Sequence, residues 1–148
     1  MTSWIFQGNP KIFRIDDYLR DNKEIFWNVN QHRNEILCGD VVYIWRANGD
    51  VKGSGGIVAK GIIIECEYTM PDNFRKYWIK EKKYTSEGVK IVIEDVRLNK
   101  DNYMLMRDDL KNDNVVKDME IINFPIKVNF KLRPEHSRHI DDLWGKKK

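Results

Sequence analysis

The apolar residues of this chain fall into short runs separated by turn signals, which predicts mainly strands with a few helices. The run Trp4–Phe6 predicts a short strand that ends at Gly8-Asn9-Pro10, because proline donates no backbone amide and restricts the residue before it. Residues 25–29 predict a second strand. Residues 41–47, rich in β-branched and aromatic side chains, predict the strongest strand of the first half.

The glycine-rich loop over residues 49–56 predicts a hairpin that joins this strand to another over residues 57–67, with a bulge at Gly61. Residues 89–98 and 126–132 alternate partly between apolar and polar side chains, as strands with one solvated face do.

Two helices are predicted from their ends. Asp16 or Asp17 is expected to cap a short helix that closes at residues 21–22. Pro134 is expected to open a second helix, in which apolar residues recur at helical spacing over residues 136–144.

Strands interleaved with short helices, without a repeated βαβ unit, indicate an α+β fold with a curled, largely antiparallel sheet or small β-barrel. The length of 148 residues fits one domain, residues 1–148, with residues 145–148 as a frayed basic tail.

Composition and charge exclude several classes of protein. No run approaches 18 apolar residues and the first residues lack a signal-peptide core, so we expect no membrane partner and a cytoplasmic location. Cys38 and Cys66 are too few for a disulfide scaffold and are expected to be reduced. The net charge of +3 does not by itself establish a polyanionic partner.

The most suggestive local feature is a basic and aromatic segment over residues 74–84. Lys and Arg neutralise phosphates, and aromatic faces stack on exposed bases. The segment combines Phe74, Tyr77, Trp78 and Tyr84 with Arg75, Lys76, Lys80, Lys82 and Lys83. The alternative is an amphipathic segment with Phe74, Trp78 and Ile79 packed inward.

Trp27, Trp45 and Trp78 are candidates to line a pocket, whereas Trp4 and Trp144 are assigned to packing. The glycine loop lacks the spacing and the following helix of a nucleotide-binding loop. His136 and His139 have no evident third ligand, so no metal or other cofactor is expected. No enzyme signature is evident.

Four pieces of the sequence, in this order, resemble an EVE domain, a member of the PUA-like group that also includes the YTH and ASCH domains. They are residues 4–10, 27–31, 39–45 and 55–61, after which the resemblance thins to the basic and aromatic segment, a middle strand and residues 129–132. The resemblance covers essentially the whole chain. It implies a small curled β-barrel around a pocket that takes a modified base out of its strand.

The resemblance also implies a ligand and partners. EVE relatives are similar to readers of 5-methylcytosine or 5-hydroxymethylcytosine in DNA, and YTH relatives read N6-methyladenine in RNA. The expected ligand is therefore modified DNA or RNA. A restriction or defence role would need a separate nuclease or ATPase, since no such motif is present here.

Site residues follow from the resemblance by position. Those implied for the base pocket are Gly8, Asn9, Trp27, Asn28, Asn30, Trp45, Asn48, Ser54 and Trp78. Those implied for phosphate contacts are Arg75, Lys76, Lys80, Lys82 and Lys83. Trp27 is the expected first wall of the pocket. The second wall is expected to be Tyr77, Trp78 or Tyr84, and Trp78 is the first choice.

Two other interpretations compete with a non-catalytic base reader. One is an ASCH-like amidohydrolase acting on a modified nucleoside, with Lys60, Glu65 and Thr69 as candidate residues. The other is an RNA-binding or interaction domain without a base pocket, in which Trp27 and Trp78 would both be fully buried.

Overall fold

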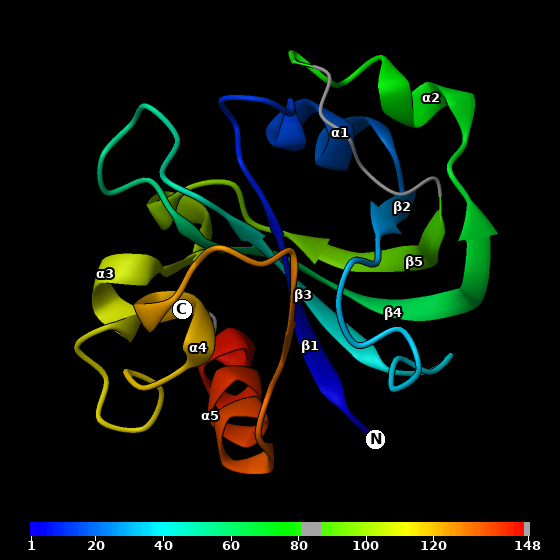
Figure 1. Ribbon diagram of the computed structural model, residues 1–148. Helices are drawn as coiled ribbons and strands as arrows, with labels where there is room; N and C mark the ends of the chain where they lie inside the picture. The colour runs from blue at the N-terminus through cyan, green and yellow to red at the C-terminus, as the bar shows by residue number, and fades with distance from the viewer. Residues whose placement is uncertain (81–86, 147–148) are drawn as a thin grey trace.

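A computed structural model describes residues 1–80 and 87–146 (Figure 1). Its elements, in chain order, are β1 (Ser3–Gly8), α1 (Ile15–Asp21), β2 (Glu24–Asn28), β3 (Val41–Arg46), β4 (Gly56–Thr69), α2 (Asp72–Arg75), β5 (Glu87–Val96), the 3-10 helix η1 (Lys100–Asn102), β6 (Leu105–Met106), α3 (Arg107–Leu110), α4 (Glu120–Asn123), β7 (Asn129–Lys131) and α5 (Pro134–Gly145).

All seven strands belong to one mixed sheet. Six of them follow the order β2-β5-β4-β3-β1-β7, and β6 pairs with β4. β1 and β3 are parallel, and every other ladder is antiparallel. The predicted hairpin between β3 and β4 is confirmed, as is a register shift between Lys60 and Gly61. The α+β class is therefore confirmed, whereas strand pairing does not show a closed barrel.

Helices cover both faces of the sheet, with α1 and α2 on one side and α3, α4 and α5 on the other (Figure 1). Successive strand residues point to opposite faces. Trp4 and Phe6 thus belong to one core cluster, and Ile5 and Trp45 to a second one. This explains why β1 and β3 are continuous apolar runs rather than alternating ones.

Asn129 connects the two ends of the sheet. This fully buried residue begins β7, and its side-chain amide donates to the Asn28 carbonyl at the end of β2 (3.1 Å). Its side-chain oxygen accepts from the backbone N–H of Asn30 (2.7 Å) and Gln31 (3.2 Å). In return, the side-chain oxygen of Gln31 accepts from the Asn129 N–H (2.9 Å). Reciprocal amide bonds thus take the place of a strand ladder between β2 and β7.

Three expectations about local structure are wrong. Helix α1 begins at Ile15, so the two aspartates lie in its first turn and form no side-chain cap. The last strand spans only Asn129–Lys131, because residues 124–128 form a hydrogen-bonded loop instead. Cys38 and Cys66 were expected to be reduced but are joined as a disulfide. Cys38 lies just before β3, and Cys66 lies within β4.

Other expectations hold. Pro134 opens α5, and Trp4 and Trp144 are buried in packing positions. Helix α5 includes Gly145, so the expected tail is shorter than four residues, and residues 147–148 lie outside the described residues. None of the helices in residues 1–80 and 87–146 has the length and apolar character that crossing a membrane requires.

Replacement of Asn129 by alanine should strongly destabilise the fold. Three backbone groups lose their partner where the segment after β2 meets β7, and an unsatisfied group costs about 1 to 3 kcal/mol where it is buried, as at Asn28. We expect the free energy of unfolding in urea to fall by about 3 kcal/mol. Asn73→Ala, at an exposed position of α2, is the control and should change it by less than about 0.5 kcal/mol. Equal stability of the two variants would contradict the connecting role of Asn129.

Candidate functional site

A cavity of about 400 Å³ opens beside the junction of β1, β2 and the segment before β7. Its volume lies within the range of about 300 to 1,000 Å³ that is usual for small-ligand pockets. The lining residues are Gln7, Gly8, Asn9, Ile12, Phe13, Trp27, Asn28, Asn30, Ala47, Phe74, Trp78, Pro125, Ile126, Lys127 and Val128.

Aromatic rings form one side of this cavity. Trp27 on β2 packs edge-on against Phe13, with 6.0 Å between ring centroids, and is 4% exposed. Trp78, which is half-buried, contacts Phe13 at 5.0 Å and Phe74 at 5.7 Å. Phe13 therefore holds both tryptophans, which line the same cavity from different elements.

Gly8 fixes the position of Trp27. A side-chain carbon at Gly8 would lie 3.1 Å from the Trp27 ring and 3.1 Å from Ile15, closer than ordinary contacts. The absence of a side chain at the end of β1 therefore lets the indole approach the backbone.

Side-chain amides supply the polar part of the lining. Asn28 and Asn30 follow one another along the end of β2, and their backbone groups are held by Asn129. Asn9, which was expected to bind a base edge, uses its side-chain oxygen to accept from the Lys11 N–H (3.0 Å). Its backbone carbonyl accepts from the N–H groups of Ile12 and Phe13. Asn9 thus shapes the turn that presents Phe13.

The structure brings six of the nine predicted pocket residues to this cavity and leaves three elsewhere. Gly8, Asn9, Trp27, Asn28, Asn30 and Trp78 line it. Trp45 does not, because it lies one position from Ile44 on β3 and points to the opposite face, where it is fully buried. Trp45, which the resemblance implied for the base pocket, is therefore a core residue.

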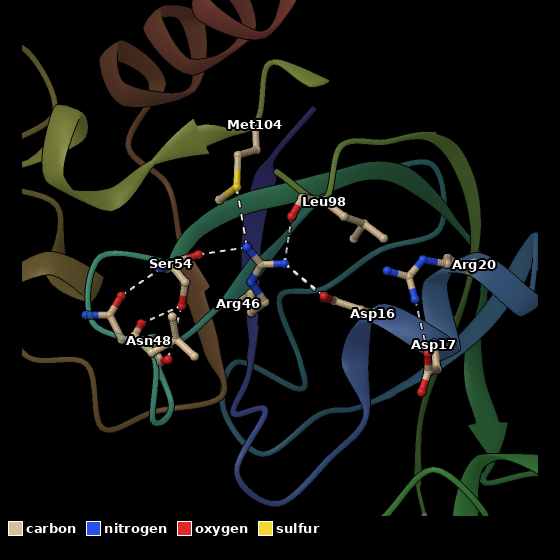
Figure 2. A network of polar contacts seen from close by, with 10 residues as sticks. Asp16, Asp17, Arg20, Arg46, Asn48, Ser54, Leu98 and Met104 are labelled. Carbon is tan, nitrogen blue, oxygen red and sulfur yellow. Dashed lines mark hydrogen bonds and ion pairs between the residues drawn. The ribbon is translucent and has the colours of Figure 1, made fainter. Parts of the chain in front are cut away.

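Asn48 and Ser54 do not line the cavity either, and they belong to a loop that Arg46 anchors (Figure 2). Asn48 accepts from the Gly55 N–H (2.7 Å), and the Ser54 hydroxyl donates to carbonyls within the loop. The nearly buried Arg46 guanidinium donates to the Ser54 carbonyl (2.8 Å) and pairs with Asp16 on α1 (3.0 Å). The glycine loop is thus a structural support, and its two polar side chains stabilise it internally.

The second aromatic wall is contributed by Trp78. Tyr77 is buried, donates its hydroxyl to Asp21 (2.8 Å) and packs on Tyr18, so it does not line the cavity. Tyr84 lies outside the described residues.

The basic side chains of this region point to solvent. Arg75, Lys76 and Lys80 are exposed, and the Lys76 ammonium lies 5.3 Å from the centre of the Tyr77 ring. None of the three lines the cavity. Lys82 and Lys83 lie outside the described residues. The amphipathic alternative is correct for Phe74 but wrong for Ile79, which is exposed.

Sequence reasoning missed the residues that complete the cavity. Phe13 and Phe74 were not assigned to a pocket, and the segment over residues 125–128 was placed in a strand. The signal available for Phe13 was its position directly after the turn at residues 8–10. No local signal predicts residues 125–128, since the chain returns to this place only through the pairing of β7 with β1.

The candidate residues for a hydrolase are not brought together. Lys60 pairs with Asp141 on α5 (3.1 Å) and lies over the Tyr43 ring. Glu65 faces Lys90 instead (3.5 Å), and Thr69 is exposed at the far end of β4. None of Lys60, Glu65 and Thr69 lines the cavity.

The histidines of α5 contact carboxylates on the segment before α4. His136 contacts Asp118 (2.9 Å) and His139 contacts Asp113 (2.8 Å). Hydrogen bonds from Arg133 and then His136 hold the pKa of Asp118 below its ordinary value. Within residues 1–80 and 87–146, no group of three or more His, Cys, Asp or Glu side chains could hold a metal ion.

Comparison with known proteins assigns the family. The EVE domain family matches residues 2–143, so the chain belongs to the EVE domain family. No curated protein matches this sequence closely enough to count as a relative.

Solved structures share the fold at low sequence identity. A hypothetical protein from Leishmania major has a TM-score of 0.67 at 15% identity, over 97% of this chain and 94% of that one. A Pseudomonas syringae protein has a TM-score of 0.64 at 19% identity, over 95% and 98%. Human THYN1, in complex with 5-methylcytosine-containing DNA, has a TM-score of 0.63 at 17% identity, over the whole of both chains. At these identities the likeness establishes the fold alone.

Trp78 should account for most of the tryptophan emission that a small quencher can reach. The other four tryptophans are buried, whereas Trp78 is half-buried at the cavity. We expect Trp78→Phe to remove most of the acrylamide-quenchable fluorescence and Trp45→Phe to leave it unchanged. Quenching that persists in Trp78→Phe would place another tryptophan at the surface.

Acid should weaken the fold partly through Asp118. Because its folded pKa is lowered from 3.8, its contribution to stability is present above that value and is lost as pH falls through the folded pKa. The melting temperature of Asp118→Asn should therefore lie below that of the wild type at pH 6, with the difference vanishing at strongly acidic pH. The exposed Asp142→Asn variant is the control. A difference independent of pH would contradict this role.

Proposed function

We propose that this EVE domain is a non-catalytic nucleic-acid-binding module that takes one modified base into the cavity lined by Trp27 and Trp78. The preferred base is of the 5-methylcytosine or 5-hydroxymethylcytosine type. The observation that carries the proposal is the combination, in one 400 Å³ cavity, of two tryptophans with two asparagines, Asn28 and Asn30.

The chemistry of this lining suits a flipped base. Aromatic faces stack on a base with about 1 to 3 kcal/mol each, which is comparable to the few kcal/mol that taking a base out of its stack costs. Asparagine side chains both donate and accept hydrogen bonds, as the edge of a cytosine requires. The apolar rings provide contact for a methyl group, and one such group in a close-fitting pocket contributes about 1 to 3 kcal/mol.

The exposed cations beside the cavity support binding to the backbone. Arg75, Lys76 and Lys80 extend from α2 and the residues after it, next to Trp78. In our proposal they contact the phosphates that flank the flipped base, and Lys82 and Lys83 extend this set. Such contacts raise affinity for any strand without distinguishing bases, and they weaken as salt concentration rises.

Two further points support a binding role. Lys60, Glu65 and Thr69 lie apart from one another and from the cavity, which disfavours the amidohydrolase alternative. The solved complex of human THYN1 contains 5-methylcytosine-containing DNA, and that protein shares the fold of this chain. In our proposal the module acts with a separate nuclease or ATPase.

The test is binding of short single-stranded oligonucleotides at two salt concentrations, followed by fluorescence anisotropy. Each carries one central cytosine, 5-methylcytosine, 5-hydroxymethylcytosine, adenine or N6-methyladenine. We expect a modified cytosine to bind about tenfold more tightly than cytosine, since one methyl group discriminates by about 1 to 3 kcal/mol. Trp78→Ala should lose this preference, and Trp78→Phe should keep part of it through stacking.

Trp45→Phe, on the opposite face of the sheet, is the control and should bind as the wild type does. Circular dichroism of each variant establishes that it is folded. Equal binding of all five oligonucleotides, abolished at the higher salt concentration, would refute the proposal.

A further inference from the structure

The cavity has an exposed apolar edge to which the proposed function assigns no role. The rim segment, residues 124–128, connects α4 to β7, and three of its residues project from the surface. Ile126 is 89% exposed and Phe124 is 68% exposed, and Pro125 lies between them. Pro125 and Ile126 also line the cavity, so the exposed side chains stand at its mouth.

The backbone of the rim segment is held in place. The Gln7 side-chain amide on β1 donates to the carbonyls of Pro125 (3.2 Å) and Lys127 (2.8 Å). The Gln7 N–H donates to the Val128 carbonyl (2.8 Å), and Gln31 accepts from the Val128 N–H (3.1 Å). Ile126 is thus presented from a fixed backbone, and a preorganised group loses less freedom when it binds.

A second exposed apolar side chain lies next to the cavity lining in the sequence. Ile79 follows Trp78 and is exposed, and its N–H donates to the carbonyl of Ile12, a residue of the cavity lining (2.8 Å). The exposed Lys80 stands next to Ile79, whereas Lys127, next to Ile126, pairs with Glu120 (2.7 Å). These residues thus combine apolar side chains with the positive charge of Lys80, which fits a ligand that has flat apolar faces and an anionic backbone.

We propose that Ile126, supported by Phe124 and Pro125, is a wedge that enters the stack of double-stranded DNA and fills the gap left by the base in the cavity. This inference rests on the proposed function and extends it from the base to its source, a duplex. Apolar side chains of this kind, inserted between base steps, are a known means of opening a stack.

Because the rim segment is continuous with the cavity, we expect DNA rather than a protein to bind to it. A protein docked on Ile126 and Pro125 would cover the mouth, because both residues also line it. A duplex that has released one base fills both places at once, with the base inside and the gap at the rim.

The test compares one oligonucleotide in two forms, single-stranded and paired with its complement, each with one central 5-methylcytosine. In a single strand there is no paired partner to stabilise and no closed stack to open, so the wedge matters only in the duplex. We expect Ile126→Ala to weaken duplex binding about tenfold and to change single-strand binding by less than about twofold. Ile126→Leu, which keeps the apolar bulk, should restore duplex binding.

Leu37→Ala is the matched control, because Leu37 is an apolar side chain with 62% exposure that does not line the cavity. It should bind both forms as the wild type does. A 2-aminopurine placed next to the modified base reports opening of the stack directly. Its fluorescence should rise when the wild type binds the duplex, and rise less with Ile126→Ala.

The outcomes separate the two proposals. A wild type that does not prefer 5-methylcytosine in the single strand refutes the proposed function and this inference with it. A wild type with that preference, and an Ile126→Ala variant with unchanged duplex affinity, overturns the wedge alone. Equal losses on the duplex and on the single strand also overturn it, since Ile126 would then be only a wall of the pocket.

Discussion

The reciprocal amide contact between Asn129 and Gln31 is the constraint on which the site depends. Each residue accepts backbone N–H groups of the other's segment, so the end of β2 and the start of β7 are fixed without a strand ladder. Buried polar groups of this kind are costly when unpaired, so they favour a single arrangement. That arrangement places Trp27 and residues 125–128 on the same cavity.

The two-sided sheet explains how a chain of this size can provide a pocket. Helices on both faces bury most of β1 and β3, and the second cluster around Trp45 and Trp144 supplies packing without taking part in the cavity. The first core cluster contains Phe13 and Trp27, which also line the cavity. Arg46 links this face to the glycine loop through Asp16 and Ser54, which holds the loop in place (Figure 2).

Aromatic rings and glycine act together at the pocket. Gly8 lets the Trp27 ring lie against the end of β1, and Phe13 contacts both Trp27 and Trp78. The two tryptophans thus share Phe13 as a neighbour. A pocket built in this way combines a rigid inner wall at Trp27 with a half-buried outer wall at Trp78.

The sequence by itself determined the main strands, the β3–β4 hairpin, the bulge at Gly61 and helix α5, because these follow from local periodicity and turn residues. It also indicated Gly8, Trp27 and Trp78 through the family resemblance. Only the tertiary structure decided that Trp45 faces the other side of the sheet, since one residue of register reverses the face. It alone brought residues 125–128 to the cavity, because contacts between segments about a hundred residues apart leave no local pattern in the sequence.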